Sequence, residues 1–134
     1  DYNEQSYIFN DIQNFMAEHH ILPIVIGYDD WSAGEIVSMF TQVYGDVCYN
    51  VTQTTKTFSQ PMKVYKELLG NGKILFDDPV ATWNHMNVVV RMDANGNIFP
   101  NKAKAKNKID VFVSQLDAFV AFEKNHENLM YYYN

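Results

Sequence analysis

Three aspartates in this chain occupy positions that suit the binding of a divalent cation. Asp29 lies at the polar end of ILPIVIGYDD, a continuous apolar run that predicts a buried, parallel strand. Asp110 and Asp117 share one stripe of a predicted C-terminal helix that is apolar on most of its circumference. Ligands of open α/β sheets collect at the carboxyl ends of strands. Because carboxylates bind Mg²⁺, and two such ions can drive phosphodiester hydrolysis, the three aspartates are candidate metal ligands.

The helical stripe also has a simpler interpretation. It contains Asp110, Ser114, Asp117 and Ala121, and such a stripe can meet solvent at the edge of a sheet. If it is buried instead, an unpaired carboxylate is costly enough to require a partner such as a cation. Asp30, which follows Asp29, is interpreted as a cap of the next helix.

A basic segment precedes the C-terminal helix. Alternate positions carry Lys102, Lys104, Lys106 and Lys108. In an extended backbone their ammonium groups would point the same way and form a local patch for a phosphate backbone. The whole chain has 10 Lys plus Arg against 16 Asp plus Glu, a formal charge of −6. This balance excludes nucleic-acid binding by bulk attraction, so the segment is either a local DNA contact or a solvated loop.

Other chemistries find little support in the sequence. The four histidines and Cys48 do not have the spacing of a zinc site. Because Cys48 is the single cysteine of the sequence, no internal disulfide can form. Gly70-Asn-Gly72 follows a predicted helix and precedes a predicted strand, the reverse of the order in a phosphate-binding loop, so ATP binding by this chain is not expected. No apolar run approaches the roughly 20 residues of a membrane helix, and no membrane association is expected.

The periodicity predicts an α/β fold in which strands alternate with helices. Helices are expected over residues 7–20, 31–44, 59–69, 78–86 and 108–124, with Asp30 or Ser32 capping the second and Pro61 in the first turn of the third. Strands are expected within residues 21–30, 47–54 and 73–78, and Asn95-Gly96 predicts a hairpin over residues 87–100. With 134 residues, 47% of them hydrophobic, the chain is expected to form one domain.

Several segments together resemble the C-terminal nuclease domain of the large terminase subunit of tailed bacteriophages. The matching segments are IVIGYDDWSAGEIV, TFSQPMKVYKELLGNGKILFDDPVATW and NVVVRMDANGNIFPNKAKAKNKID. They resemble the family's strand ending in Tyr-Asp, its Ser-x-Pro helix with the Pro-Val-x-x-Trp segment, and its Asn-Val hairpin with Lys-Ile-Asp. The chain departs from the pattern at Val111, where the family has Gly, and at Asp117, where it has an apolar residue.

The resemblance implies a ribonuclease H-like mixed sheet flanked by helices, with residues 1–134 as the C-terminal part of one nuclease domain. Its early strand, which bears the first catalytic Asp, precedes the helix over residues 7–20, so the fold is expected to be incomplete at its N-terminus. By motif, Asp29 and Asp110 are implied catalytic residues and ligands of Mg²⁺ or Mn²⁺. Asp117 is an additional candidate ligand, and Lys102 to Lys108 are expected near the DNA.

The implied function is a metal-dependent endonuclease that cuts concatemeric double-stranded DNA, with the chain alone weakly active or inactive. The implied partners are the terminase ATPase domain, the small terminase subunit and the portal protein, in the cytoplasm of an infected or lysogenic bacterial host. An alternative is a non-catalytic module of the packaging motor that docks onto a partner such as the portal.

Overall fold

The computed structural model describes residues 4–133. In chain order, its elements are α1 (Glu4–Glu18), β1 (Ile26–Tyr28), α2 (Gly34–Tyr44), β2 (Cys48–Asn50), α3 (Thr55–Gly70), α4 (Pro79–Met86), β3 (Val90–Met92), β4 (Ile98–Pro100), α5 (Asp110–Lys124) and α6 (His126–Tyr133). β1 and β2 pair in parallel, with Ile26 opposite Cys48. β3 and β4 pair antiparallel, with Met92 opposite Ile98. The fold is therefore mixed α/β, as predicted.

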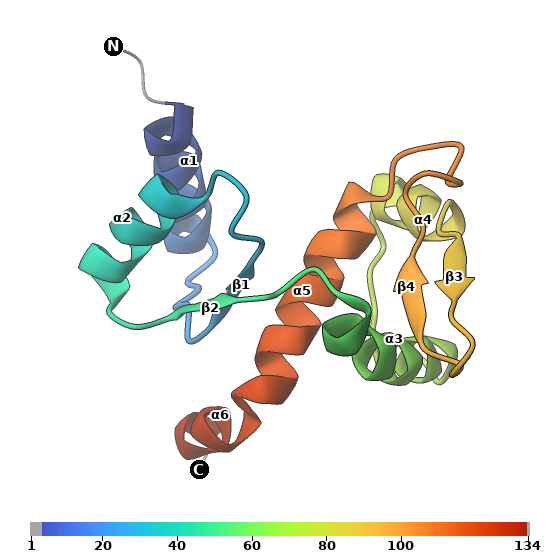
Figure 1. Ribbon diagram of the computed structural model, residues 1–134. Coiled ribbons are helices and arrows are strands. Elements are labelled where there is room, and N and C mark those ends of the chain that lie inside the picture. The colour runs from blue at the N-terminus through green and yellow to red at the C-terminus, as the bar shows by residue number, and fades with distance from the viewer. Residues whose placement is uncertain (1–3, 134) are drawn as a thin grey trace.

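Helix α5 runs through the middle of the molecule. On one side of it lie α1, α2, β1 and β2, and on the other lie α3, α4, β3 and β4 (Figure 1). The chain crosses from the first group to the second between β2 and α3, and α6 follows α5 at the C-terminal end. α5 is thus the element that both groups share.

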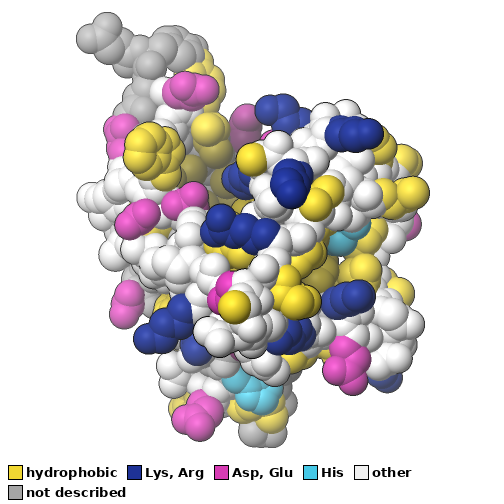
Figure 2. Space-filling view, turned by 45° about the vertical axis from the view of Figure 1, so that its right-hand side comes forward, with side chains coloured by type: hydrophobic (Ala, Val, Ile, Leu, Met, Phe, Trp, Pro, Cys, Tyr) yellow, Lys and Arg dark blue, Asp and Glu magenta, His cyan; other side chains and the backbone are white. Residues whose placement is uncertain are grey.

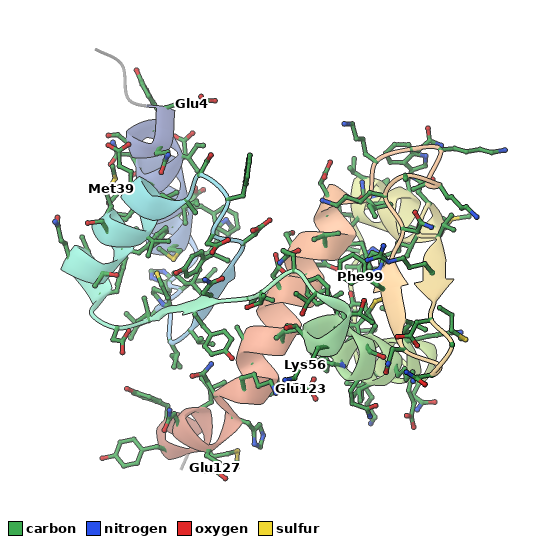
Figure 3. All side chains as sticks on the ribbon, in the orientation of Figure 1. Glu4, Met39, Lys56, Phe99, Glu123 and Glu127 are labelled. Atoms are coloured by element: carbon green, nitrogen blue, oxygen red, sulfur yellow. The ribbon has the colours of Figure 1, made fainter. Side chains whose placement is uncertain are left out.

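Two separate clusters of buried side chains stabilise the two groups. The larger cluster joins α3, β4 and α5 and contains Val51, Phe58, Met62, Tyr65, Ile98, Ile109, Phe112, Val113, Leu116 and Val120. The smaller cluster joins α1 and α2 through Phe9, Met16 and Phe40, with the Phe9 and Phe40 rings edge to face at 4.9 Å. The side-chain view shows the larger cluster between the ribbons of α3, α5 and the hairpin, where Phe99 packs against it (Figure 3).

Several helices begin where a capping side chain satisfies their first backbone N–H groups. α4 follows the prediction, because Asp78 accepts a hydrogen bond from the Ala81 N–H and Pro79 starts the helix. α3 begins four residues earlier than predicted, since Thr54 accepts from the Thr57 N–H. Pro61 therefore lies inside α3 and not in its first turn.

The predicted caps of α2 are wrong. The helix begins at Gly34, Ser32 has a φ of 58°, and neither Asp30 nor Ser32 caps it. Gln5 of α1 takes that role, because its Oε1 accepts from the Ile36 N–H at 2.8 Å and its Nε2 donates to the Ser32 carbonyl at 2.9 Å. The N-terminus of α2 is therefore satisfied by a side chain from another helix.

Three further expectations differ from the structure. The strands form two separate two-stranded sheets in the described residues, where one mixed sheet was expected. Residues 73–78 form no strand. The Lys73 N–H donates to the Leu68 carbonyl at 2.9 Å, Ile74 packs on the larger cluster, and the Phe76 ring lies 4.4 Å from His85. Residues 126–133 form α6, which no sequence pattern indicated.

Candidate metal and DNA-binding site

The site begins with a close approach between β1 and α5. A Cβ atom at Gly27 would clash with the main-chain carbonyl of Asp117 and would lie 3.0 Å from the Ala121 Cβ. Only a glycine therefore allows the strand and the helix to pack this closely. The contact places the end of β1 beside the middle of α5, where Asp117 lies.

Asp117 is a buried carboxylate with 6% of its surface exposed. Its Oδ1 accepts a hydrogen bond of 3.0 Å from Gln53 Nε2, and the same amide donates to the Val51 carbonyl at 2.9 Å. Burial raises the pKa of Asp117, the hydrogen bond from Gln53 lowers it, the negative charge of Asp29 raises it, and the charge of Lys102 lowers it. The structure therefore excludes the interpretation in which the Asp117 part of the stripe meets solvent.

Asp29 is exposed and follows β1, as predicted. Its Oδ1 accepts a hydrogen bond of 3.2 Å from the Trp31 N–H, which leaves Oδ2 available to a ligand. The neighbouring Asp30 accepts from Asn50 Nδ2 at 3.3 Å and so links the ends of β1 and β2. Because the charge of Asp29 acts on Asp117, the two carboxylates share one electrostatic environment.

Asp110 lies at the other end of the stripe. It is the first residue of α5 and is exposed, about 10 Å along the helix axis from Asp117 by the 1.5 Å rise per residue. The Val111 N–H beside it donates to Asn84 Oδ1 at 3.0 Å, so the buried Asn84 of α4 caps α5. The stripe thus runs from exposed Asp110 and Ser114 to buried Asp117 and Ala121.

The lysine segment lies beside Asp110 but is not extended. All four lysines are exposed, and residues 102–104 form a turn in which the Ala105 N–H donates to the Asn101 carbonyl at 3.1 Å. Asn101 Oδ1 also accepts from the Lys104 N–H, and Asn87 Nδ2 donates to the Lys108 carbonyl at 3.1 Å. The predicted alternation along an extended backbone is therefore wrong, because these hydrogen bonds favour a compact loop.

Several basic groups nevertheless lie on the same face of the molecule (Figure 2). In the view that brings the hairpin side forward, Lys and Arg side chains spread across the middle and the upper right, while most visible Asp and Glu lie toward the left and the bottom (Figure 2). A net charge of −6 is thus compatible with a local basic surface.

No group of three or more His, Cys, Asp or Glu side chains within residues 4–133 is placed to hold a metal ion. The three predicted ligands therefore do not converge as one cluster in this part of the chain. Asp29 and Asp117 carry carboxylate oxygens, the ligand type that hard divalent cations bind, and the negative charge of Asp29 helps to raise the pKa of Asp117.

Two important residues of the site were not identified from the sequence. Gly27 has a recognisable signal, since an isolated glycine inside a strand pattern often marks a close backbone approach. Gln53 has none, because its role depends on the path of the chain after β2 bringing it to α5.

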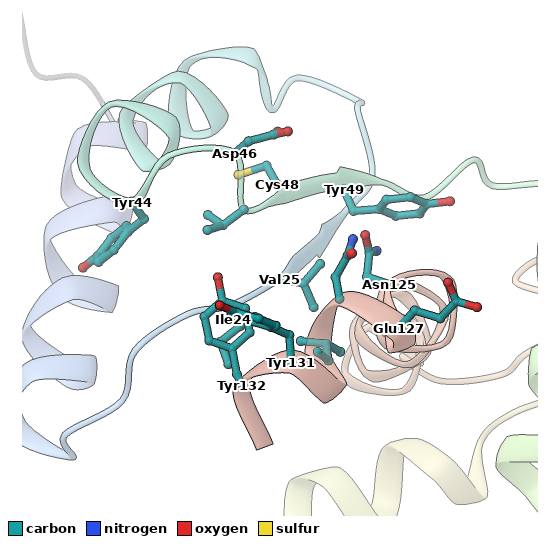
Figure 4. Close-up of a pocket in the computed structure, with 13 residues that line it drawn as sticks. Ile24, Val25, Tyr44, Asp46, Cys48, Tyr49, Asn125, Glu127, Tyr131 and Tyr132 are labelled. Atoms are coloured by element: carbon teal, nitrogen blue, oxygen red, sulfur yellow. The ribbon is translucent and has the colours of Figure 1, made fainter. Parts of the chain in front are cut away.

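A separate pocket of about 720 Å³ lies between the β1–β2 pair and α6. Tyr131 and Tyr132 of α6 face Tyr44, Asp46 and Cys48 across it (Figure 4). None of the three candidate metal ligands lines this pocket. In the described part of the chain, no helix is both long and apolar enough to span a bilayer.

The mixed α/β fold thus carries an aspartate after β1, a buried aspartate in α5 and a basic loop before α5. The family model of the terminase large subunit, endonuclease domain, matches residues 3–127, and the chain belongs to this family of phage DNA packaging.

The crystal structure of the HK97 bacteriophage large terminase is similar in fold, with a TM-score of 0.74 and 22% sequence identity. The match covers 88% of this chain and 25% of the terminase chain, so this chain spans about a quarter of the length of that protein. No curated protein sequence matches the chain.

Proposed function

We propose that this chain is the catalytic part of a metal-dependent endonuclease of ribonuclease H-like fold, which cuts double-stranded concatemeric DNA during phage packaging. The observation that carries the proposal is the buried Asp117 carboxylate beside Asp29 at the end of β1. Membership of the terminase endonuclease family supports the choice of DNA as substrate.

Asp29 and Asp117 are the residues of this chain that would hold a Mg²⁺ or Mn²⁺ ion. Gln53 fixes the Asp117 carboxylate through the 3.0 Å hydrogen bond, and Gly27 allows α5 to approach β1 closely enough for the two aspartates to interact. A bound divalent ion supplies stabilisation of negative charge on phosphate oxygens and activation of a water nucleophile. The family pattern also assigns Asp110 to catalysis. Asp110 begins α5 and faces the lysine loop, the segment of residues 101–109 that contains the four lysines.

The lysine loop would hold the DNA backbone. Lys102, Lys104, Lys106 and Lys108 are exposed, and the charge of Lys102 acts on Asp117. We propose that a phosphate bound to this loop lies near Asp110, which lines one pocket with Lys102, Lys106 and Lys108. Lysine ammonium groups act as point charges, so the contacts position the DNA without reading its sequence.

Within a complete terminase, residues 1–134 would form one domain or part of one. We propose an ATPase domain, a small terminase subunit and a portal protein as its partners, in the cytoplasm of an infected or lysogenic bacterial host. The chain alone is expected to be weakly active or inactive, because residues 4–133 contain no three-ligand group.

The proposal is tested by Mn²⁺ titration calorimetry and plasmid cleavage. Asp29→Asn and Asp117→Asn should each weaken Mn²⁺ binding about tenfold or more, whereas Asp11→Asn on the exposed surface of α1 should leave it unchanged. A version of the chain extended upstream should cleave plasmid DNA and lose that activity with Asp110→Asn.

One result would contradict the proposed metal site, and another would contradict the expected weak activity of the chain alone. Mn²⁺ binding with equal affinity to wild type, Asp29→Asn and Asp117→Asn would remove the carboxylate pair as the site. Robust cleavage by residues 1–134 alone, abolished by Asp110→Asn, would show that the site is complete within these residues.

The second candidate function is docking onto a partner such as the portal. The tyrosine-lined pocket favours it, because Tyr131 and Tyr132 are 84% and 66% exposed beside Tyr44, and exposed tyrosines are typical of protein interfaces. In a pull-down with purified portal, Tyr131→Ala with Tyr132→Ala should abolish binding while Mn²⁺ affinity stays unchanged. Portal binding that survives the double variant excludes this surface.

A further inference from the structure

The structure contains a small pocket beside the lysine loop, and one of its walls, Trp83, has no role in the nuclease proposal. Its volume is about 410 Å³, and α4 and the loop before α5 enclose it. The side chains that could bind a ligand there are Trp83, Lys102, Lys106, Lys108 and Asp110. The indole offers a flat apolar face, and the ammonium groups attract anions.

Trp83 contributes little to the cores described above. Its side chain is 45% exposed, whereas its neighbours Ala81 and Asn84 on α4 are 5% and 3% exposed. A single exposed hydrophobic residue is ordinary on a protein surface. Trp83 differs from such residues because its indole forms a wall of a pocket whose other walls carry lysines.

Two hydrogen bonds hold the pocket in shape. Asn84 Oδ1 accepts from the Val111 N–H at 3.0 Å, which fixes α4 to the start of α5. Asn87 Nδ2 donates to the Lys108 carbonyl at 3.1 Å, which fixes α4 to the lysine loop. Because the loop and the start of α5 are both hydrogen-bonded to α4, which carries Trp83, the indole and the loop backbone keep their relative positions before any ligand binds.

We propose that this pocket binds one unpaired nucleotide of DNA, with its base stacked on Trp83 and its phosphates on the lysines. Bases stack on aromatic side chains through their π-faces, and a positively charged groove tracks the backbone of single strands. A volume of about 410 Å³ falls within the range of small-molecule sites. The Asp110 carboxylate repels phosphate, so the phosphates should lie toward the loop.

The inference rests on the proposed function, because it makes the lysine loop a DNA contact. It adds that the DNA near Asp110 is locally unpaired, since an indole can stack on a base inside a continuous duplex only when that base has left its neighbour. Lysine contacts alone would not distinguish a duplex from a single strand.

Fluorescence can test the stacking directly, because the chain has only two tryptophans. In a Trp31→Phe background, the emission reports on Trp83 alone. Three probes are compared at one salt concentration: a single-stranded oligothymidylate, an oligomer of the same length made of abasic sites, and a blunt duplex. We expect the oligothymidylate to quench Trp83 and to bind about tenfold more tightly than the abasic oligomer.

Variants at position 83 give a second readout. Trp83→Leu should lose the preference for oligothymidylate over the abasic oligomer, and Trp83→Phe, which keeps a ring, should retain most of it. Urea unfolding and Mn²⁺ affinity should be the same for all three proteins, because Trp83 is half exposed and is not a metal ligand in the proposed site.

The outcomes separate this inference from the nuclease proposal. Equal affinity for the abasic and thymidylate oligomers, with no quenching, overturns the base pocket and leaves the phosphate contacts intact. Quenching by the blunt duplex equal to that by the single strand overturns the requirement for an unpaired base. Absence of binding to all three probes overturns the DNA role of the loop as well, and a preference that survives Trp83→Leu assigns the stacking to another residue.

Discussion

Gly27 of β1 packs directly against the main-chain carbonyl of Asp117 in α5, and a Cβ atom at position 27 would lie 2.8 Å from the carbonyl carbon. Gly27→Ala should therefore force β1 and α5 apart and lower the free energy of unfolding by about 1–3 kcal/mol. Gly34→Ala is the matched control, because no atom lies within 4 Å of its Cβ position and Ala favours the helix. Urea denaturation measures both, and a Gly27→Ala variant as stable as wild type would show that the contact yields at no cost.

The buried position of Asp117 should make folding stability depend on pH. Burial raises the pKa of Asp117 above the ordinary value of 3.8, and the charge of Asp29 adds to the effect. The folded state therefore holds this proton more tightly than the unfolded state. The stabilisation is complete below pH 3.8 and is lost as pH rises through the folded pKa.

Asp117→Asn removes this titration. We expect the difference in unfolding free energy, wild type minus Asp117→Asn, to fall as pH rises from below 3.8 toward neutrality. Urea denaturation of both proteins over a series of pH values measures it. A difference that stays constant or increases with pH would contradict the raised pKa.

Gln53 should act as a positioning residue for the metal site. Gln53 is uncharged and is not a proposed ligand, but its Nε2 donates to both Asp117 Oδ1 and the Val51 carbonyl. Gln53→Ala should weaken Mn²⁺ binding about tenfold by freeing the carboxylate, as outer hydrogen-bond partners do elsewhere. Calorimetry measures the affinity, and Gln60→Ala on the exposed face of α3 is the control. Rescue by Gln53→Asn is not expected, since the shorter side chain reduces the reach to Asp117.

The lysine loop should make DNA binding depend on salt. Replacing Lys102, Lys104, Lys106 and Lys108 by Ala should weaken binding for all duplex sequences and reduce the slope of log affinity against log salt by about 1 for each phosphate that is no longer neutralised. The control variant replaces four other exposed lysines, Lys56, Lys66, Lys73 and Lys124, which changes the net charge equally. Equal effects of the two variants would mean that only the net charge matters.

Asn84 should be the most important single side chain for the start of α5. It is 3% exposed and caps the helix by accepting from the Val111 N–H. Asn84→Ala leaves that N–H without its acceptor and should cost about 1–2 kcal/mol. Asn14→Ala on the exposed surface of α1 should change stability by less than about 0.5 kcal/mol. Similar losses of stability for the two variants in urea denaturation would refute the capping role.

Sequence patterns correctly predicted the features that depend on residues close together in the chain. The helix predicted over 78–86, the hairpin turn at Gly96 with its φ of 77°, and the helix predicted over 108–124 all follow from local patterns. The apolar run within residues 21–30 was predicted to form a parallel strand, and β1 pairs in parallel with β2.

The remaining features depend on contacts between distant segments. Gln5 caps α2 and Asn84 caps α5 from other helices, so no local pattern at either helix start could reveal them. Asp29 and Asp110 were identified through motifs. In the structure, the charge of Asp29 acts on Asp117 instead, because β1 packs against α5 at Gly27 and Gln53 reaches the Asp117 carboxylate. Burial of Asp117 follows from that packing, and helical periodicity alone left it open.

The position of α5 between two separate hydrophobic clusters has a consequence for local unfolding. The smaller cluster has three buried residues, Phe9, Met16 and Phe40, against ten in the larger cluster, so the α1–α2 part should open at a lower free energy than the part around α3. Asp29 lies on the weaker part and Asp117 on the stronger one. A cation shared by these carboxylates would link the two parts, so added Mn²⁺ should slow amide hydrogen exchange in α1 and α2, which contain none of the proposed ligands.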